Sequence, residues 1–130
     1  MKIFILCGGF GTRLDHESKL IAKPMVRIGK EPILYHLIEN FYRQGFNEFV
    51  LCLGYRAETI INYFLKEKAN FTKIVKENKK IIKIFFKDKK IDITINLINT
   101  GIKTGTGGRI KIAYDSLKLN EDILMTYGDG

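Results

Sequence analysis

The run Gly8-Gly9-Phe10-Gly11-Thr12-Arg13 places three glycines beside an arginine, directly after an apolar segment. Glycine tolerates positive φ without a steric penalty and leaves its backbone N–H groups accessible, so such a loop can surround a phosphate. The guanidinium of Arg13 adds paired donors that match two phosphate oxygens. These residue types therefore favour phosphate binding, and the alternative is a tight turn that binds no ligand.

Spacing excludes two known glycine motifs. A Walker loop requires Gly-Lys and then Ser or Thr after four intervening residues, and no such tripeptide follows Gly8 or Gly9. The dinucleotide fingerprint requires a third glycine three residues after Gly11, where this sequence has Leu14. The segment is therefore neither a Walker ATPase loop nor a standard NAD-binding turn.

Three further charged side chains, one carboxylate and two cations, are candidates for binding a metal ion or an anion. Asp129 stands between two glycines that leave it open to a hydrated cation, and Mg²⁺ favours one or two carboxylates together with phosphate oxygens. Arg109 follows Gly107-Gly108 at the expected start of a helix, whose N–H groups also attract anions. Lys23 lies in the otherwise uncharged stretch 20–26. The alternatives are a turn-capping role for Asp129 and a solvated loop position for Lys23.

Apolar periodicity predicts the elements that position these residues. Strands and helices alternate, which favours an α/β fold: a Rossmann-like, mostly parallel sheet with helices on both faces. A chain of 130 residues suits one core and one domain. The alternating apolar residues from Ile91 to Leu97 predict a strand with one solvated face. The predicted strands are 1–7, 48–53, 81–86, 91–98 and 123–127, with a turn at 88–90, and the predicted helices are 32–44, 57–66 and 109–117.

Four segments follow predicted strands directly: Gly8–Arg13, Gly54-Tyr55, Thr100–Arg109 and Gly128-Asp129. In a parallel sheet the carboxyl ends of the strands lie at one edge, and ligands bind in the loops there. Structural turns alone do not explain four such loops at once. The sequence therefore predicts that the four loops converge on one edge of the sheet.

The glycine loop resembles the opening of the sugar-phosphate nucleotidyltransferases, a strand followed by Gly-Gly-x-Gly-Thr-Arg-Leu. Ala22-Lys23-Pro24-Met25 is similar to the Pro-Lys-Pro-Met of this family, with Ala22 in place of the first proline. The segment Ile28–Leu34 is similar to the family's helix entry, and Gly54-Tyr55 to a Gly-Tyr after its second strand. The resemblance extends over the whole chain.

Two later segments narrow the resemblance. Thr100–Arg109 reads TGIKTGTGGR and is similar to the cytidylyltransferase form of a loop that most members carry as Gly-Thr-Ala or Gly-Leu-Ala. Tyr127–Gly130 resembles the strand end that binds the metal. The resemblance therefore implies a nucleotidyltransferase-type fold in which CTP reacts with a sugar 1-phosphate, with glucose 1-phosphate as the default acceptor, to give a CDP-sugar and pyrophosphate in nucleotide-sugar biosynthesis. A cytidylyltransferase for another small phosphorylated metabolite stays open.

The resemblance also implies roles for single residues. Arg13 would hold the pyrophosphate, Lys23 would lie near the α-phosphate, and Asp129 would bind the cofactor Mg²⁺; these three are the candidate catalytic residues. The resemblance assigns Thr104 to contact with the nucleotide, although a turn-capping role explains a threonine at this position nearly as well. The implied nucleotide or substrate contacts are Leu6, Cys7, Gly8, Gly9, Phe10, Gly11, Thr12, Arg13, Lys23, Thr104, Arg109 and Gly128.

Enzymes that this chain resembles are about twice as long. We therefore expect residues 1–130 to form the N-terminal, nucleotide-binding part of a nucleotidyltransferase domain whose fold is incomplete at its C-terminus. The second metal carboxylate and most of the acceptor pocket would lie beyond residue 130. By itself the chain is expected to bind nucleotide weakly and to release no pyrophosphate, so a non-catalytic nucleotide-binding fragment stays open. The full-length enzyme is expected to be a homo-oligomer.

The net charge of +8 is concentrated in one segment, because ten lysines and three acids between Lys66 and Lys90 contribute +7 of it. That segment has no arginine and no nucleic-acid motif, so a solvated face is favoured over nucleic-acid binding. No apolar run reaches the ~18 residues of a membrane span. Cys7 and Cys52 have the spacing of neither a metal site nor a disulfide framework. We expect a cytoplasmic protein with reduced thiols and no nucleic-acid or membrane partner.

Overall fold

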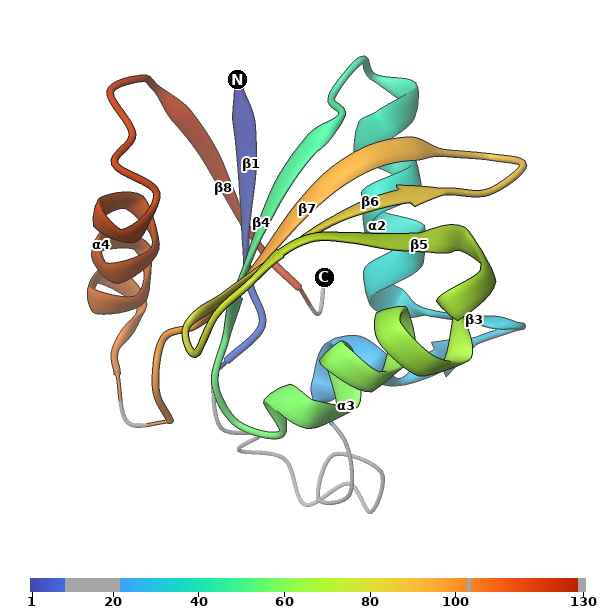
Figure 1. Cartoon of the computed structure of the whole chain (residues 1–130), viewed down its shortest axis with the longest axis horizontal. Coiled ribbons are helices and arrows are strands. Elements are labelled where there is room, and N and C mark those ends of the chain that lie inside the picture. The colour runs from blue at the N-terminus through green and yellow to red at the C-terminus, as the bar shows by residue number, and fades with distance from the viewer. Residues whose placement is uncertain (9–21, 103, 129–130) are drawn as a thin grey trace.

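A six-stranded sheet forms the centre of the molecule, with its strands in the order β5-β6-β7-β4-β1-β8 (Figure 1). The computed structural model describes residues 1–8, 22–102 and 104–128. Strands β1, β4, β7 and β8 are parallel to one another, whereas β6 pairs antiparallel with both β5 and β7. The predicted mostly parallel α/β sheet is confirmed. The strands are β1 Lys2–Leu6, β4 Glu48–Leu53, β5 Thr72–Glu77, β6 Ile81–Lys87, β7 Asp92–Asn99 and β8 Ile123–Tyr127.

Helices cover both faces of this sheet (Figure 1). On one face lie α2 (Ile33–Arg43) and α3 (Ala57–Asn62), and α3 continues into the single turn η2 (Tyr63–Glu67). On the other face lies α4 (Thr106–Ser116). None of the described helices has both the length and the apolar composition needed to cross a membrane.

Each face of the sheet has its own apolar core, because successive side chains of a strand point to opposite faces. Ile5 and Leu51 pack against α2 and α3, whereas Phe4, Val50 and Cys52 pack against α4. Since β1 and β4 are covered on both sides, their sequences are continuous apolar runs rather than alternating ones.

A short antiparallel ribbon connects the single turn η1 (Lys23–Met25) to α2. It consists of β2 (Arg27–Ile28) and β3 (Glu31–Pro32), and Gly29 in the turn between them has φ +72°. A side chain at Gly29 would strain this turn. The ribbon places η1 beside the end of β8, as shown below, while η3 (Ala69–Phe71) leads the chain from η2 into β5.

Two sequence predictions about the fold are wrong, and one strand was not predicted. The second face of β7 is not solvated, since Ile98 packs into the core beneath α4 and Asn96 is 7% exposed. The strand β5 was not predicted, because five of its six side chains are exposed and give no buried pattern. Helix α4 begins at Thr106 rather than Arg109, so Gly107 and Gly108 belong to its first turn.

Two turns of the β5-β6-β7 meander use the same local chemistry. The side-chain Oδ1 of Asp88 accepts hydrogen bonds from the amides of Lys90 and Ile91, each at 2.8 Å. The side chain of Asn78 accepts in the same way from the amides two and three residues later, each at 2.9 Å. The predicted turn at 88–90 is confirmed. The matching sequences NKKI and DKKI are the signal that would have revealed the turn after β5 as well.

Candidate functional site

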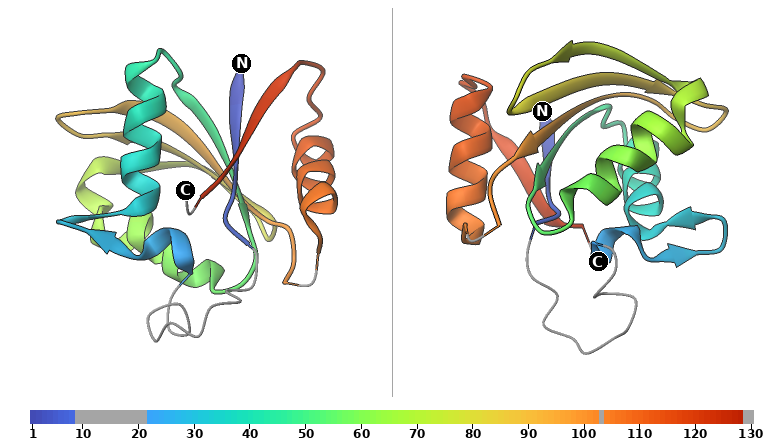
Figure 2. Two further views of the ribbon diagram at one scale, coloured as in Figure 1. Left: turned by 180° about the vertical axis from the view of Figure 1, so that it is seen from behind. Right: turned by 60° about the horizontal axis from the view of Figure 1, so that its bottom comes forward.

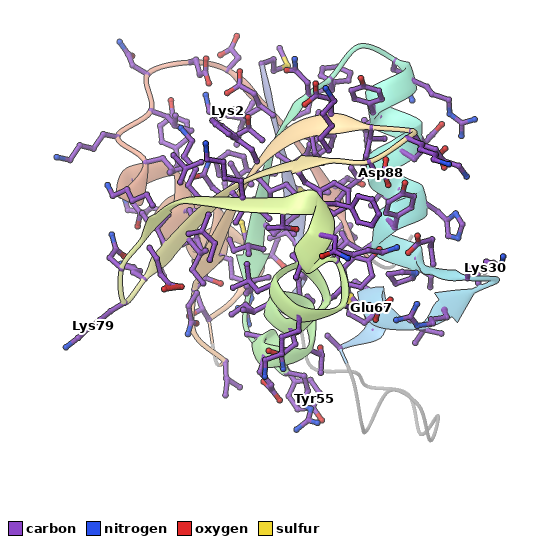
Figure 3. The ribbon with its side chains drawn as sticks, turned by 45° about the vertical axis from the view of Figure 1, so that its right-hand side comes forward. Lys2, Lys30, Tyr55, Glu67, Lys79 and Asp88 are labelled. Atoms are coloured by element: carbon purple, nitrogen blue, oxygen red, sulfur yellow. The ribbon has the colours of Figure 1, made fainter. Side chains whose placement is uncertain are left out.

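The chain segments that follow the parallel strands lie at one edge of the sheet (Figure 2, right). The amide of Tyr55 donates to the carbonyl of Gly8 at 3.3 Å, which joins the end of β4 to that of β1. The amide of Gly128 donates to the carbonyl of Leu6 at 2.9 Å, which joins the end of β8 to that of β1. The side chain of Tyr55 projects from this edge (Figure 3). The predicted convergence of loops is confirmed for the residues that the structure describes.

Arg109 is a buried cation at this edge, with 4% of its surface exposed. Its Nη1 donates to Thr100 Oγ1 at 2.9 Å and to the carbonyl of Gly101, and its Nη2 donates to the carbonyl of Ile102 at 2.9 Å. Burial lowers the pKa of the guanidinium, which stays charged at neutral pH because its ordinary value is so high. The contact of Arg109 with a nucleotide stays a prediction. In this structure its Nη atoms bind the loop after β7.

Thr100 joins Arg109 to the neighbouring strand, a role that the sequence analysis missed. Its hydroxyl accepts from Arg109 and donates to the carbonyl of Leu53 at 2.8 Å, and its amide donates to the same carbonyl at 2.8 Å. Only 3% of Thr100 is exposed. No pattern in the sequence distinguishes this buried threonine from the more exposed Thr104 and Thr106, so its role emerges only from the structure.

Gly8 and Gly54 lie directly against the Arg109 guanidinium. A Cβ on Gly8 would collide with Nη1 and would lie 2.8 Å from Cζ and from the amide nitrogen of Gly54. A Cβ on Gly54 would also collide with Nη1, and would lie 2.7 Å from the carbonyl of Gly8 and 2.8 Å from that of Gly101. Glycine is therefore required at both positions by packing, because neither φ lies in the left-handed region.

The Lys23 segment lies beside the ends of β1 and β8. A Cβ on Gly128 would lie 3.0 Å from Pro24 Cγ and 3.1 Å from Cys7 Sγ, so these three residues are in close contact. Lys23 is half-buried and begins η1 with Pro24 in the first turn. The structure therefore brings together five of the predicted site residues: Leu6, Cys7, Gly8, Gly128 and Lys23.

Thr104 lies close to Thr100 and the first turn of α4. Its hydroxyl donates to the carbonyl of Thr100 at 2.6 Å, which is the turn-capping geometry considered as the alternative. Its methyl group would lie 2.8 Å from a Cβ on Gly108. The contact of Thr104 with a nucleotide stays a prediction.

The remaining predicted site residues lie outside the described part of the chain. They are Gly9, Phe10, Gly11, Thr12, Arg13 and the metal ligand Asp129. In the ranges 1–8, 22–102 and 104–128, no group of three or more His, Cys, Asp or Glu side chains could hold a metal ion. The Asp129 carboxylate follows Gly128 directly, and the chemistry of such a donor fits Mg²⁺ when phosphate oxygens supply further ligands.

A polar network that the sequence analysis missed fixes the ribbon that precedes α2. Glu31 accepts from the Tyr63 hydroxyl at 2.6 Å and pairs with Lys68 Nζ at 2.7 Å. Arg27 pairs with Glu67 at 2.5 Å. Burial, followed by the bond to Glu31, raises the pKa of Tyr63. A hollow of about 330 Å³ lies beside this network, lined by Met25, Arg27, Thr59, Asn62, Tyr63, Lys66 and Glu67.

Both cysteines are buried thiols, as predicted. Cys7 belongs to the core beneath α2 and α3, whereas Cys52 belongs to the core beneath α4, so they lie on opposite faces of the sheet. Burial raises the pKa of the Cys52 thiol to about 12, and the nearby charge of Arg109 opposes part of this rise. An unreactive thiol at each position follows from this burial.

Comparison with known proteins identifies the family to which this chain belongs. The family described as nucleotidyl transferase matches residues 2–129. The chain belongs to the nucleotidyl transferase family. It is 38% identical to the glucose-1-phosphate cytidylyltransferase of Salmonella typhimurium, with 100% of this chain and 51% of that protein covered. The probable glucose-1-phosphate cytidylyltransferase of Bacillus subtilis is also 38% identical, with 100% and 50% covered.

Two solved structures share the fold of this chain. The structure of HddC from Yersinia pseudotuberculosis complexed with GMP-PN superposes with a TM-score of 0.69 at 32% identity, and 98% of this chain and 47% of HddC are covered. UTP-bound UGPase from Acinetobacter baumannii also has a TM-score of 0.69, at 18% identity and with 98% and 45% covered. The chain thus spans about half the length of the curated relatives and structures that it matches.

Proposed function

We propose that this member of the nucleotidyl transferase family is the nucleotide-binding half of an enzyme that converts CTP and glucose 1-phosphate to CDP-glucose and pyrophosphate. The observation that carries the proposal is the joining of the Gly8, Gly54, Thr100–Ile102 and Gly128 segments at one edge of the sheet. The assignment of CTP and glucose 1-phosphate is supported by two relatives of that name at 38% identity.

The proposed reaction is an in-line displacement at the α-phosphorus of CTP. A phosphate oxygen of the sugar phosphate forms the new P–O bond while the bond to the β-phosphate oxygen breaks, and pyrophosphate leaves. Such chemistry needs positioning and charge neutralisation rather than a protein nucleophile. The proposed roles are contact of Arg13 with the pyrophosphate and of Lys23 with the α-phosphate, whereas Asp129 would hold Mg²⁺, which neutralises triphosphate charge when it is bound.

The position of Lys23 suits this role. The half-buried residue begins η1, whose Pro24 touches Gly128, the residue before the proposed metal ligand. The ribbon that follows η1 is fixed by the bonds of Glu31 to Tyr63 and Lys68, so the segment has a defined place at the edge. These contacts support a fixed ammonium near the reacting phosphate rather than a lysine on a free loop.

Titration calorimetry with CTP, GTP, UTP and ATP, each with Mg²⁺, tests the nucleotide assignment. We expect CTP to bind the chain most tightly. A pyrophosphate-release assay on the complete gene product, with glucose 1-phosphate and mannose 1-phosphate as acceptors, then tests the acceptor. Equal or tighter binding of another triphosphate would contradict the CTP assignment, and faster turnover of mannose 1-phosphate would contradict the glucose assignment.

A second candidate function is a guanylyltransferase. It is favoured by HddC, whose structure contains GMP-PN, and by a probable mannose-1-phosphate guanylyltransferase of rice at 33% identity over 98% of this chain and 32% of that protein. The same titration separates the two candidates. Preferential binding of GTP would replace the CTP assignment and leave the nucleotidyl transferase chemistry unchanged.

A further inference from the structure

We propose that Arg109 is a positioning residue that fastens the ends of β1, β4 and β7 to one another, so that the three strand ends hold a single geometry. Its proposed effect on the nucleotide rests on the proposed function, whereas the fastening itself does not. Arg109 lies in the first turn of α4, on the chain segment that follows the loop after β7. It thus connects the helix to the ends of the strands.

The hydrogen bonds of the guanidinium define the first part of this fastening. Nη1 and Nη2 donate to the carbonyls of Gly101 and Ile102, and Nη1 also donates to the hydroxyl of Thr100. That hydroxyl donates in turn to the carbonyl of Leu53 at the end of β4. A continuous chain of hydrogen bonds therefore runs from α4 through the loop after β7 to β4.

Packing defines the second part. The Arg109 guanidinium occupies the space where a side chain of Gly8 or Gly54 would be, and Gly8 follows β1 as Gly54 follows β4. The two backbones also touch each other, since Tyr55 donates to the carbonyl of Gly8. One guanidinium is therefore in contact with all three strand ends.

This arrangement separates the charge of Arg109 from its hydrogen bonds. Within the described ranges, no carboxylate pairs with the guanidinium. Arg109 therefore contributes a positive charge to the edge of the sheet at which the loops lie. Its Nη donors are directed at the protein's own oxygens. A lysine at this position would keep the charge but could not reproduce the planar fork that reaches three acceptors. Arg109→Lys therefore distinguishes fastening from a simple electrostatic role.

Hydrogen exchange in the absence of nucleotide is the decisive experiment. In Arg109→Lys, we expect the amides of Tyr55 and Thr100, which bond across neighbouring strand ends, to exchange about tenfold faster or more. The amides in the middle of β4 should exchange at the wild-type rate. Unchanged exchange at both Tyr55 and Thr100 would overturn the proposal.

A second variant keeps the experiment informative if Arg109→Lys loosens the whole sheet. Thr100→Val has nearly the same shape but lacks the hydroxyl that joins Arg109 to Leu53, and it should loosen the same two amides to a smaller extent. The matched control is Gly107→Ala, since a Cβ on Gly107 meets no atom within 4 Å. Faster exchange in the control than in Thr100→Val would also overturn the proposal.

Nucleotide affinity supplies a readout that a purely structural role would not move. CTP–Mg²⁺ affinity is measured at a temperature where circular dichroism finds every variant fully folded. Arg109→Lys should weaken it about tenfold and Thr100→Val to a smaller extent, because both break the bond between Arg109 and the Thr100 hydroxyl. The double variant should lose no more affinity than the single variant with the larger loss. Two independent contacts would instead give additive losses in binding free energy and would contradict the proposal.

The hydrogen-exchange and affinity measurements test this inference and the proposed function separately. Absence of any nucleotide binding by the wild-type chain would contradict the proposed function, while hydrogen exchange would still decide whether Arg109 fastens the loops. Wild-type affinity in Arg109→Lys, together with unchanged exchange, would reject the positioning role and leave the proposed function intact.

Discussion

The loop edge around Arg109 and the β5-β6 hairpin carry positive charge in opposite ways. At the loop edge one guanidinium is 4% exposed and donates to three oxygens of the loop after β7. In the hairpin the lysines extend into solvent, and Lys79 projects from its tip away from the sheet (Figure 3). The net charge of +8 comes mostly from the second region, whereas the contacts that shape the site come from the first. The place of a charge is therefore more informative than the number of charges.

The largest expected effect tests the loop edge. Lys23→Ala and Arg13→Ala in the complete gene product should each lower kcat/KM by about 10²-fold, equivalent to ~3 kcal/mol of lost phosphate stabilisation. The matched control is Lys89→Ala, in the turn between β6 and β7 at the other end of β7. Steady-state kinetics at saturating acceptor measures both. A loss in the control as large as that in Lys23→Ala would contradict the placement of the reacting phosphates at the loop edge.

An intermediate effect is expected where the meander contacts α2. The Tyr35 hydroxyl donates to Asp88 Oδ2 at 2.6 Å, and Tyr35→Phe should cost about 1–2 kcal/mol of unfolding free energy at pH 7. Burial raises the pKa of Asp88, but hydrogen bonds from Tyr35 and from the amides of Ile91 and Lys90 outweigh it, so the net pKa is lowered. A lowered pKa stabilises the fold above the ordinary pKa of an aspartate, and this stability is lost as the pH falls through the lowered value.

Urea unfolding at pH 7 and at successively lower pH checks this prediction, since the Asp88 carboxylate takes up a proton as the pH falls through its lowered pKa. The difference between wild type and Tyr35→Phe should shrink on acidification. Tyr42→Phe on the same helix is the control, because its hydroxyl has no hydrogen bond to any residue that the structure describes. An equal difference at every pH would mean that the Asp88 carboxylate is not the group that Tyr35 stabilises.

The smallest effect is expected in the hairpin itself. Lys79→Gln should change the unfolding free energy by less than about 0.5 kcal/mol, as is usual for exposed positions. At low salt it should slow nucleotide association by no more than about threefold, and at physiological salt the difference should vanish because exposed charges are screened. Stopped-flow binding at two salt concentrations measures this. An effect that persists at physiological salt would indicate direct contact between this lysine and the ligand.

The sequence predicted those elements whose residues are buried in a regular pattern. Strand β4 and helix α2 have apolar residues that reveal one or two buried faces, so their positions agree with the structure. Strand β5 has Lys73 and Lys76 among exposed residues and gave no such pattern. Strand β7 has a polar Asn96 that indicated solvent, although the residue is buried. A local sequence pattern does not reveal which face of a strand is covered by a helix from a distant part of the chain.

The edge at which the candidate site residues lie was predictable from the sequence, but the contacts among these residues were not. Glycines after strands indicated the edge at which Gly8, Gly54 and Gly128 lie together. The direction of the Arg109 side chain was not predictable, because an arginine at a helix start can equally face a ligand or the protein. The same holds for Thr100, whose buried hydroxyl depends on the neighbouring strand. Long-range packing decides such orientations, and no short motif records it.

The placement of the two cysteines on opposite faces of the sheet has a practical consequence. Each core contains a single thiol, so the wild-type chain carries one natural probe for each face. A thiol reagent can reach Cys52 only when the α4 side opens, and Cys7 only when the other side opens. Mass spectrometry after timed labelling would therefore give separate opening rates for the two halves of the molecule without any introduced label.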